Sequence, residues 1–184
     1  MFTLEECRAI IEPHCGPSFS FREIVKPPSR RHALPPRELV RNIIPTLELA
    51  NEARIRMTYR CDREGWPFHG LRVNAAYRPF GGAGDSQHKH FRALDLDVML
   101  VDWDPAAVDH STDFRRAWYE VLVGLWHEHR KEMRLGLYCS RGRDYGVRGH
   151  IDTGSNVTRT WQIAGKSTYV QPACAFAIAG RLGL

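Results

Sequence analysis

The sequence lacks any run of 18 apolar residues, so we expect no segment that spans a membrane. It also lacks a dense Lys/Arg run with interleaved aromatic residues, although its formal net charge is +5 and its isoelectric point is about 9.1. A mildly basic chain favours an anionic partner, which would be either a cell-wall polymer or a nucleic acid. Because the basic run is absent, nucleic-acid binding is the weaker interpretation, and we expect none.

Cysteine is scarce, with five residues, an odd number, and no Cys-x-x-Cys pair. The spacing therefore gives no indication of a metal site built from thiolates. The cysteines are most simply free thiols in a reducing compartment, several of them buried, although a Cys7–Cys15 disulfide is conceivable. None of them lies in the histidine and aspartate motifs described below, which argues against an enzyme with a nucleophilic cysteine.

Length and composition indicate one globular domain. The chain has 184 residues, of which 43% are hydrophobic and 26% are charged. It contains no internal repeat and no low-complexity tract. We therefore expect a single domain over residues 1–184 that is large enough for a substantial core. We also expect a monomer.

Periodicity and turn residues predict helices around a small sheet. Thr3 and Glu6 form a capping-box pattern before a short helix, Pro36 opens a longer helix, and Pro45 kinks it. Thr112, or the serine before it, caps a third helix. Strands are expected at 71–75, 93–99, 135–139, 149–153 and 158–163. The predicted fold class is α+β, with a small, mostly antiparallel sheet flanked by helices.

Two histidines and one aspartate, carried by two separate segments, form the most informative pattern. His88 follows a glycine-rich stretch, Asp95 lies seven residues later, and His150 lies 55 residues after Asp95. Three protein ligands plus one open position is the arrangement of a catalytic zinc site, whereas a structural zinc site is usually closed by four ligands. The pattern therefore points to a zinc centre formed by His88, Asp95 and His150.

Alternation within each segment decides which side chains share a face. Asp95 and Asp97 fall on one face of a predicted strand, so that one binds metal while the other supports the site or meets solvent. His150 and Asp152 share a face of a second predicted strand. If the two strands are neighbours, His88, Asp95 and His150 meet at one point. The alternative is that the histidines are ordinary polar loop residues and the acids form a solvated strand face.

These motifs resemble those of the M15 group of zinc D,D- and L,D-peptidases, whose fold is shared with hedgehog signalling domains. The family pattern is Ser-x-His, Gly-x-Ala-x-Asp and a distant His-x-Asp; here it reads Ser86-x-His88, Ala93-x-Asp95 and His150-x-Asp152. The family's Ser-Gly-Tyr-Arg appears as Ala75-Ala76-Tyr77-Arg78, and residues 150–154 followed by Arg159-x-Trp161 are similar to a bacterial branch. The resemblance covers roughly residues 19–163, with a motif core at about 71–163.

The resemblance implies a role for each motif residue. His88, Asp95 and His150 would hold zinc, and Asp152 would orient His150. Arg78 would polarise the scissile carbonyl or hold the tetrahedral oxyanion; the alternative is a structural ion pair. Ser86 would bond the substrate or fix the loop. Tyr77 and Trp161 would contact substrate or line its groove, although Trp161 is also compatible with a place in the core.

Two departures from the family pattern affect these expectations. Phe91 stands where the family usually has glycine, so we expect a different path for the loop between His88 and Asp95. Many members carry an acid three residues before the last histidine as general base, and Val147 occupies that position here. The nearest upstream acid is Asp144, six residues before His150, and we take it as the candidate base. Its alternative role is to stabilise a turn.

Three hypotheses for function follow. The first is a zinc peptidase that hydrolyses peptidoglycan stem-peptide bonds involving D-amino acids by zinc-activated water, as a carboxypeptidase or an endopeptidase. The second is a non-catalytic metal-binding or wall-binding relative of the same fold. The third is an unrelated basic globular protein, such as a phage structural component. No secretion signal is visible, so we expect a protein that is cytoplasmic as synthesised. A phage endolysin released to the wall and an exported enzyme whose leader has been lost both remain open.

Overall fold

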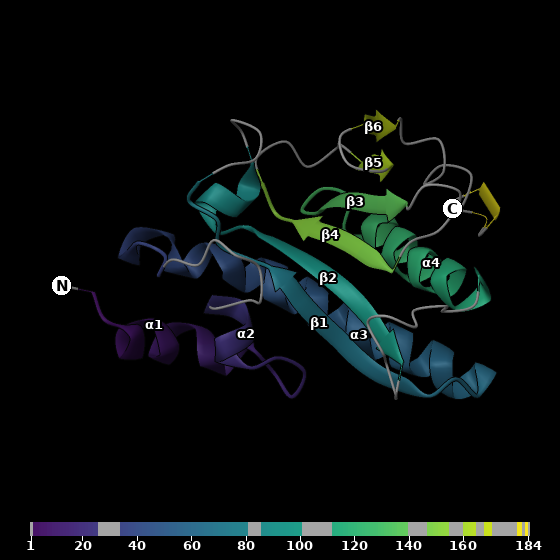
Figure 1. Ribbon diagram of the computed structural model, residues 1–184, viewed down its shortest axis with the longest axis horizontal. Helices are drawn as coiled ribbons and strands as arrows, with labels where there is room; N and C mark the ends of the chain where they lie inside the picture. The colour runs from purple at the N-terminus through teal and green to yellow at the C-terminus, as the bar shows by residue number, and fades with distance from the viewer. Residues whose placement is uncertain are drawn as a thin grey trace.

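The computed structural model describes residues 2–25, 34–80, 86–100, 112–139, 147–154, 160–164, 168–170, 180–181 and 183 (Figure 1). The helices are α1 (Leu4–Ile11), α2 (Phe21–Val25), α3 (Ile44–Glu64) and α4 (Thr112–Glu128). Short 3-10 segments are η1 (Glu12–His14), η2 (Arg37–Ile43) and η3 (Gln87–His90). The strands are β1 (Phe68–Ala75), β2 (Ala93–Leu100), β3 (Arg134–Cys139), β4 (Arg148–Asp152), β5 (Thr160–Ala164) and β6 (Thr168–Val170).

The strands form one sheet in the order β1-β2-β4-β3-β5-β6. All neighbouring pairs are antiparallel except β3 and β5, which are parallel. The predicted α+β class with a mostly antiparallel sheet is therefore confirmed. None of the described helices is long and apolar enough to cross a bilayer.

Local sequence signals explain where the helices begin. The Thr3 hydroxyl accepts a hydrogen bond from the Glu6 amide at 3.2 Å, and the Glu6 carboxylate accepts one from the Thr3 amide at 2.8 Å, so the predicted capping box is present. The helix predicted to start at Pro36 and to kink at Pro45 is instead divided in two. Residues up to Ile43 form η2, and α3 begins at Ile44, because a proline without an N–H fits the first turn of an α-helix but not its interior.

The sheet has one apolar and one polar face. The apolar side chains of β2, β3 and β4, such as Leu94, Leu96, Leu135, Leu137 and Ile151, are buried in the core. Helices α3 and α4 lie together on this face of the sheet (Figure 1). Strand alternation sends the intervening side chains to the opposite face. These are mostly charged, and they carry the site described below.

Gly149 allows β4 to approach helix α4 closely. A Cβ atom built at Gly149 would lie 2.3 Å from Leu122 Cδ1 and 3.5 Å from Trp118 Cζ2. Because Gly149 faces α4, its neighbour His150 faces the polar side of the sheet.

We expect Gly149→Ala to destabilise the fold by about 1–3 kcal/mol, since the added methyl group overpacks a closely packed core. Chemical denaturation measures this difference. The double variant Gly149→Ala/Leu122→Ala should show a favourable coupling energy, because Leu122→Ala makes room for the methyl group. Additive effects in that cycle would contradict the steric explanation.

Cys7, Cys15 and Cys61 are buried free thiols, which agrees with the expectation from sequence, and Cys7 and Cys15 are not bridged. Burial raises the pKa of the Cys7 and Cys15 thiols to about 11 and that of Cys61 to about 12. The reactive thiolate is therefore a very small fraction at pH 8.

We expect these three cysteines to resist iodoacetamide at pH 8 in the native protein and to react fully after unfolding. Peptide mapping by mass spectrometry resolves each site. Rapid labelling of Cys61 under native conditions would show that its place in the core is wrong.

Candidate metal centre

Strand pairing brings the predicted ligands together. Strands β2 and β4 are neighbours in the sheet (Figure 1), and their register places Asp95 directly opposite His150. His88 comes from η3, the 3-10 segment that precedes β2. The condition set by the sequence pattern, that the two strands be adjacent, is therefore met. The alternative of a solvated strand face is wrong, because Asp95, Asp97 and Asp152 are buried.

One oxygen of Asp95 lies at the centre of the group. Asp95 Oδ1 is 2.7 Å from His150 Nδ1 and 3.3 Å from His88 Nε2. One ligand atom from each of these three residues lies within 4.8 Å of the others. The exposed fractions are 2% for His88, 6% for Asp95 and 5% for His150, so the group is buried.

Contacts on the far side of each ring decide which nitrogen faces the centre. His88 Nδ1 lies 2.5 Å from the Ala76 carbonyl oxygen, and since a carbonyl only accepts, Nδ1 carries the hydrogen and Nε2 is left for a metal. His150 Nε2 lies 2.9 Å from Asp152 Oδ2, which leaves Nδ1 toward Asp95. Hydrogen bonds from metal-binding histidines to a carbonyl or a carboxylate are the usual outer contacts of zinc sites.

Asp152 has the predicted role of orienting His150 and is itself held in place. The Arg134 Nε atom donates to Asp152 Oδ1 at 2.7 Å, and the Gly154 amide donates to the same oxygen at 3.0 Å. Asp152 is fully buried. A continuous series of hydrogen bonds therefore runs from Arg134 through Asp152 to His150 and Asp95.

The charges of the group are strongly coupled. Burial alone would lower the pKa of His150, but its hydrogen bonds to Asp152 and Asp95 outweigh burial and raise the pKa to about 9. Burial lowers the pKa of His88 in spite of the neighbouring Asp95. Burial would raise the pKa of Asp95, yet the two histidines hold it well below its usual range. Without a metal, a proton on His150 therefore lies between two buried carboxylates, and an ion that binds His150 Nδ1 has to displace that proton.

The donor set fits zinc. Two imidazole nitrogens and one carboxylate oxygen, arranged around one point and held by outer hydrogen bonds, are ligands that zinc accepts. Carboxylate-only sites would instead favour magnesium or calcium. The structure thus supports a metal centre at His88, Asp95 and His150, and the donor chemistry favours zinc.

Arg78 lies beside this centre. Its Nη2 atom is 3.5 Å from Asp95 Oδ2, whereas both histidine rings contact Oδ1, and the Arg78 side chain is 33% exposed. Its backbone amide donates to the His88 carbonyl at 3.1 Å, which ties the segment before η3 to the ligand. Arg78 therefore combines an ion pair within the site with a partly exposed side chain.

Asp97 supports the sheet and does not join the ligands. Arg148 donates to both of its oxygens, at 2.7 and 3.0 Å, and Arg72 and Asn74 donate to Oδ2 at 3.0 and 3.2 Å. Of the two acids on this face, only Asp95 contacts the histidines, because Asp97 is paired with Arg72 and Arg148.

Tyr138, which belongs to none of the sequence motifs, also contacts this centre. This residue lies on β3, and its hydroxyl donates to Asp95 Oδ1 at 3.3 Å. The register pairs Tyr138 with Arg148, on the polar face of β4. Alternation within β3 suggested which face it occupies, but only the strand order shows that β3 lies next to β4.

The remaining predicted site residues differ in their placement. Tyr77 is buried, and its ring packs edge-on against Phe91 with centroids 5.8 Å apart, so it stabilises the loop that carries His88. Ser86 precedes η3 and is partly exposed, and its hydroxyl does not cap that segment. Trp161 pairs in register with Gly136, but its side chain lies outside the described residues, as does the whole of Asp144. Substrate contact by these residues stays a prediction.

Phe91 and Val147, the two departures from the family pattern, have clear placements. Phe91 is fully buried and adopts a left-handed backbone with φ 52° and ψ 46°, a conformation that glycine adopts more readily. The phenylalanine thus adopts a backbone conformation that favours glycine, and the expected difference in loop path stays a prediction. Val147 packs against the core, and its carbonyl accepts from the Val98 amide at 3.0 Å.

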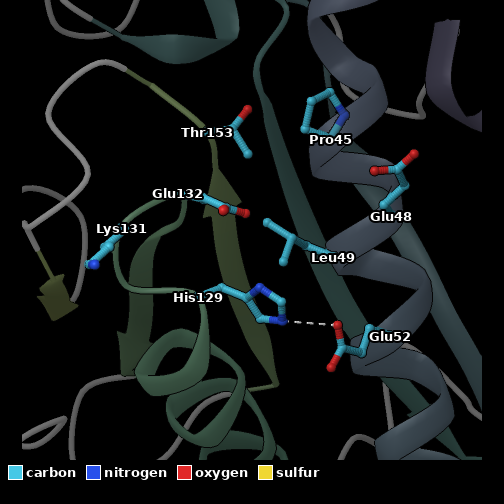
Figure 2. Close-up of a pocket in the computed structure, with 8 residues that line it drawn as sticks. All are labelled: Pro45, Glu48, Leu49, Glu52, His129, Lys131, Glu132 and Thr153. Carbon is cyan, nitrogen blue, oxygen red and sulfur yellow. Dashed lines mark hydrogen bonds and ion pairs between the residues drawn. The ribbon is translucent and has the colours of Figure 1, made fainter.

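A second group of potential ligands lies at the end of α4. Glu52, Glu128 and His129 are close enough to share an ion, but the Arg56 guanidinium binds both carboxylates and supplies the cation. Figure 2 shows His129 pointing to Glu52 at the edge of a pocket of about 530 Å³ between α3 and the turn after α4. None of the ligands of the first centre lines this pocket.

Comparison with known proteins gives no relative of this chain. No family model, no curated protein and no solved structure matches it.

Proposed function

We propose that the protein is a zinc-dependent peptidase. The observation that carries the proposal is the convergence of His88 Nε2, Asp95 Oδ1 and His150 Nδ1 on one buried point, with the outer nitrogens already bonded to Ala76 and Asp152. The order of the motifs resembles the M15 peptidases, which adds support. Zinc held there would supply Lewis acidity and lower the pKa of water toward neutrality.

The protein's own groups have distinct tasks in this proposal. The carboxylates of Asp95 and Asp152 place negative charge on both sides of the His150 ring. This charge favours binding of a cation at the buried position between the ligands. Arg78 pairs with Asp95 Oδ2, and its side chain is partly exposed. It binds the carbonyl oxygen of the scissile bond as negative charge develops on that oxygen. An acid, for which Asp144 is the candidate, accepts a proton from water and passes it to the leaving amine.

The proposed substrate is a peptidoglycan stem peptide, cut at a bond that involves a D-amino acid. This choice rests on the resemblance to the M15 group. The basic balance of the chain, with a net charge of +5, is compatible with a polyanionic cell wall. Release as a phage lysin fits the same proposal.

A second candidate function is metal-dependent binding without turnover. Val147, the residue three positions before His150, is apolar and packed against the core, so it offers no general base. If Asp144 does not take that task, the centre holds a metal and a ligand but does not hydrolyse it.

The test is mass spectrometry of purified muropeptides after incubation with the zinc-loaded protein, with a chelated sample alongside. New fragments that disappear on chelation are the expected result, and their masses identify the bond. Intact muropeptides from several wall chemotypes, in the presence of bound zinc, would support the binding function instead.

Asp144→Asn separates the base from the metal centre. We expect this variant to bind zinc as the wild type does and to lose turnover by at least about 100-fold, the lower range for a general base. Kinetics with the muropeptide identified above measure turnover, and titration with a chelating dye measures zinc. Full activity in Asp144→Asn would show that another group is the base.

A further inference from the structure

We propose that Tyr138 is a positioning residue for the metal centre: its phenol holds Asp95 so that only one carboxylate oxygen faces the two histidines. This inference rests on the metal centre of the proposed function. It adds a residue that no motif contains and that acts through Asp95.

The contact crosses one strand. Tyr138 lies on β3 and Asp95 on β2, and β4 runs between them. Gly136, which pairs with His150 in the register, has no side chain, so no bulky group stands beside the imidazole on β3. The Tyr138 hydroxyl reaches Asp95 Oδ1 at 3.3 Å from this side, whereas His88 approaches from η3.

The two oxygens of Asp95 are held by different groups. Arg78 Nη2 lies 3.5 Å from Oδ2, and the Tyr138 hydroxyl donates to Oδ1. A carboxylate oxygen accepts in two directions, so Oδ1 can receive the phenol and still offer a lone pair to an ion between the rings. With Oδ2 paired to Arg78 and Oδ1 oriented by the Tyr138 phenol, Asp95 would bind an ion through one oxygen and leave the remaining position open for substrate.

The direction of this hydrogen bond is well defined. An ionised aspartate only accepts, so the phenol is the donor. Burial first, and then the neighbouring Asp95, raise the pKa of Tyr138 above its ordinary value, which keeps the hydroxyl protonated at neutral pH. The Tyr119 hydroxyl, on α4, donates to the backbone carbonyl of Tyr138, a contact that involves neither the Tyr138 phenol nor Asp95.

The test compares zinc affinity in three proteins: the wild type, Tyr138→Phe and Tyr119→Phe. Tyr138→Phe removes only the oxygen that touches Asp95, and we expect its zinc Kd to be about 10–100-fold weaker, the usual effect of an outer-shell partner. Competition with a chromophoric chelator gives Kd. Tyr119→Phe is the matched control, because it removes a phenol oxygen near the same strand that does not touch a ligand, and it should retain wild-type zinc affinity.

A second measurement reports on the geometry of the ion rather than on folding. In the Co²⁺-loaded protein, Tyr138→Phe should weaken the visible absorption bands, because a freed carboxylate can bind through both oxygens and raise the coordination number. Thermal unfolding of the chelated proteins shows whether any variant has lost its fold.

The outcomes are distinguishable. Failure of the wild type to bind zinc would overturn the metal centre and the proposed function with it. Tight zinc binding by the wild type, with equal Kd and equal Co²⁺ spectra for folded Tyr138→Phe, would overturn the role of Tyr138 alone. Equal losses in Tyr138→Phe and Tyr119→Phe would show a merely structural effect and would also overturn it.

Discussion

His150→Ala is expected to abolish zinc binding and hydrolysis together. The substitution removes one of three ligands, which should cost more than the 10–100-fold loss typical of outer-shell changes. It also affects the metal-free protein, since His150 is the positive partner between the buried Asp95 and Asp152. Removing one partner of a buried ion pair costs about 3–5 kcal/mol. Zinc titration and chemical denaturation of the chelated protein measure the two effects separately.

His88→Ala separates metal loss from loss of stability. Burial lowers the pKa of His88, so its ring is neutral and its removal leaves Asp95 paired with His150. We therefore expect complete loss of zinc but a smaller loss of stability than in His150→Ala. His90→Ala, at an exposed position two residues from His88, is the matched control and should change neither. Retention of zinc by both ligand variants would exclude this centre.

Zinc is expected to stabilise the fold strongly. A ligand that binds only the native state at a free concentration about a thousandfold above its Kd adds roughly 4 kcal/mol. For a domain of this size, that corresponds to an increase in Tm of about 8–16 °C. The two ligand-bearing segments lie on neighbouring strands, so an ion that binds both resists their separation during unfolding.

Differential scanning fluorimetry of the chelated protein, with and without added zinc, measures the shift. Magnesium and calcium should give little or none, because two of the three donors are imidazole nitrogens. His150→Ala should show no zinc-dependent shift. An equal shift in that variant would mean that zinc binds elsewhere, with the group at Glu52, Glu128 and His129 as the first place to look.

Much of the fold and of the centre was predictable from local pattern. The capping box at Thr3 and Glu6 defined the first helix, and alternation in 93–99 indicated a strand with Asp95 and Asp97 on one face. These predictions succeeded because they depend on contacts between residues close in sequence. The prediction of one long helix that starts at Pro36 and kinks at Pro45 was only partly correct. A pattern of apolar residues does not distinguish a 3-10 turn from an α-helical one.

Other features depended on which strands are neighbours. The role of Asp97 was left open by sequence, because its partners Arg72 and Arg148 come from two other strands. Tyr138 was missed for the same reason, as its hydroxyl reaches an aspartate 43 residues away. Long-range pairing follows from the packing of the whole sheet on α3 and α4, which no local spacing encodes.

The sequence by itself determined the ligand types and the faces on which they lie, since strand alternation sets these wherever the strand is placed. Only the tertiary structure decided that β2 and β4 are adjacent, and that Nε2 of His88 and Nδ1 of His150 face the same oxygen. The reason is that one nitrogen of each ring is already hydrogen-bonded. His88 Nδ1 bonds the Ala76 carbonyl, and His150 Nε2 bonds Asp152. Which nitrogen remains for a metal is therefore a consequence of the assembled sheet and its loops.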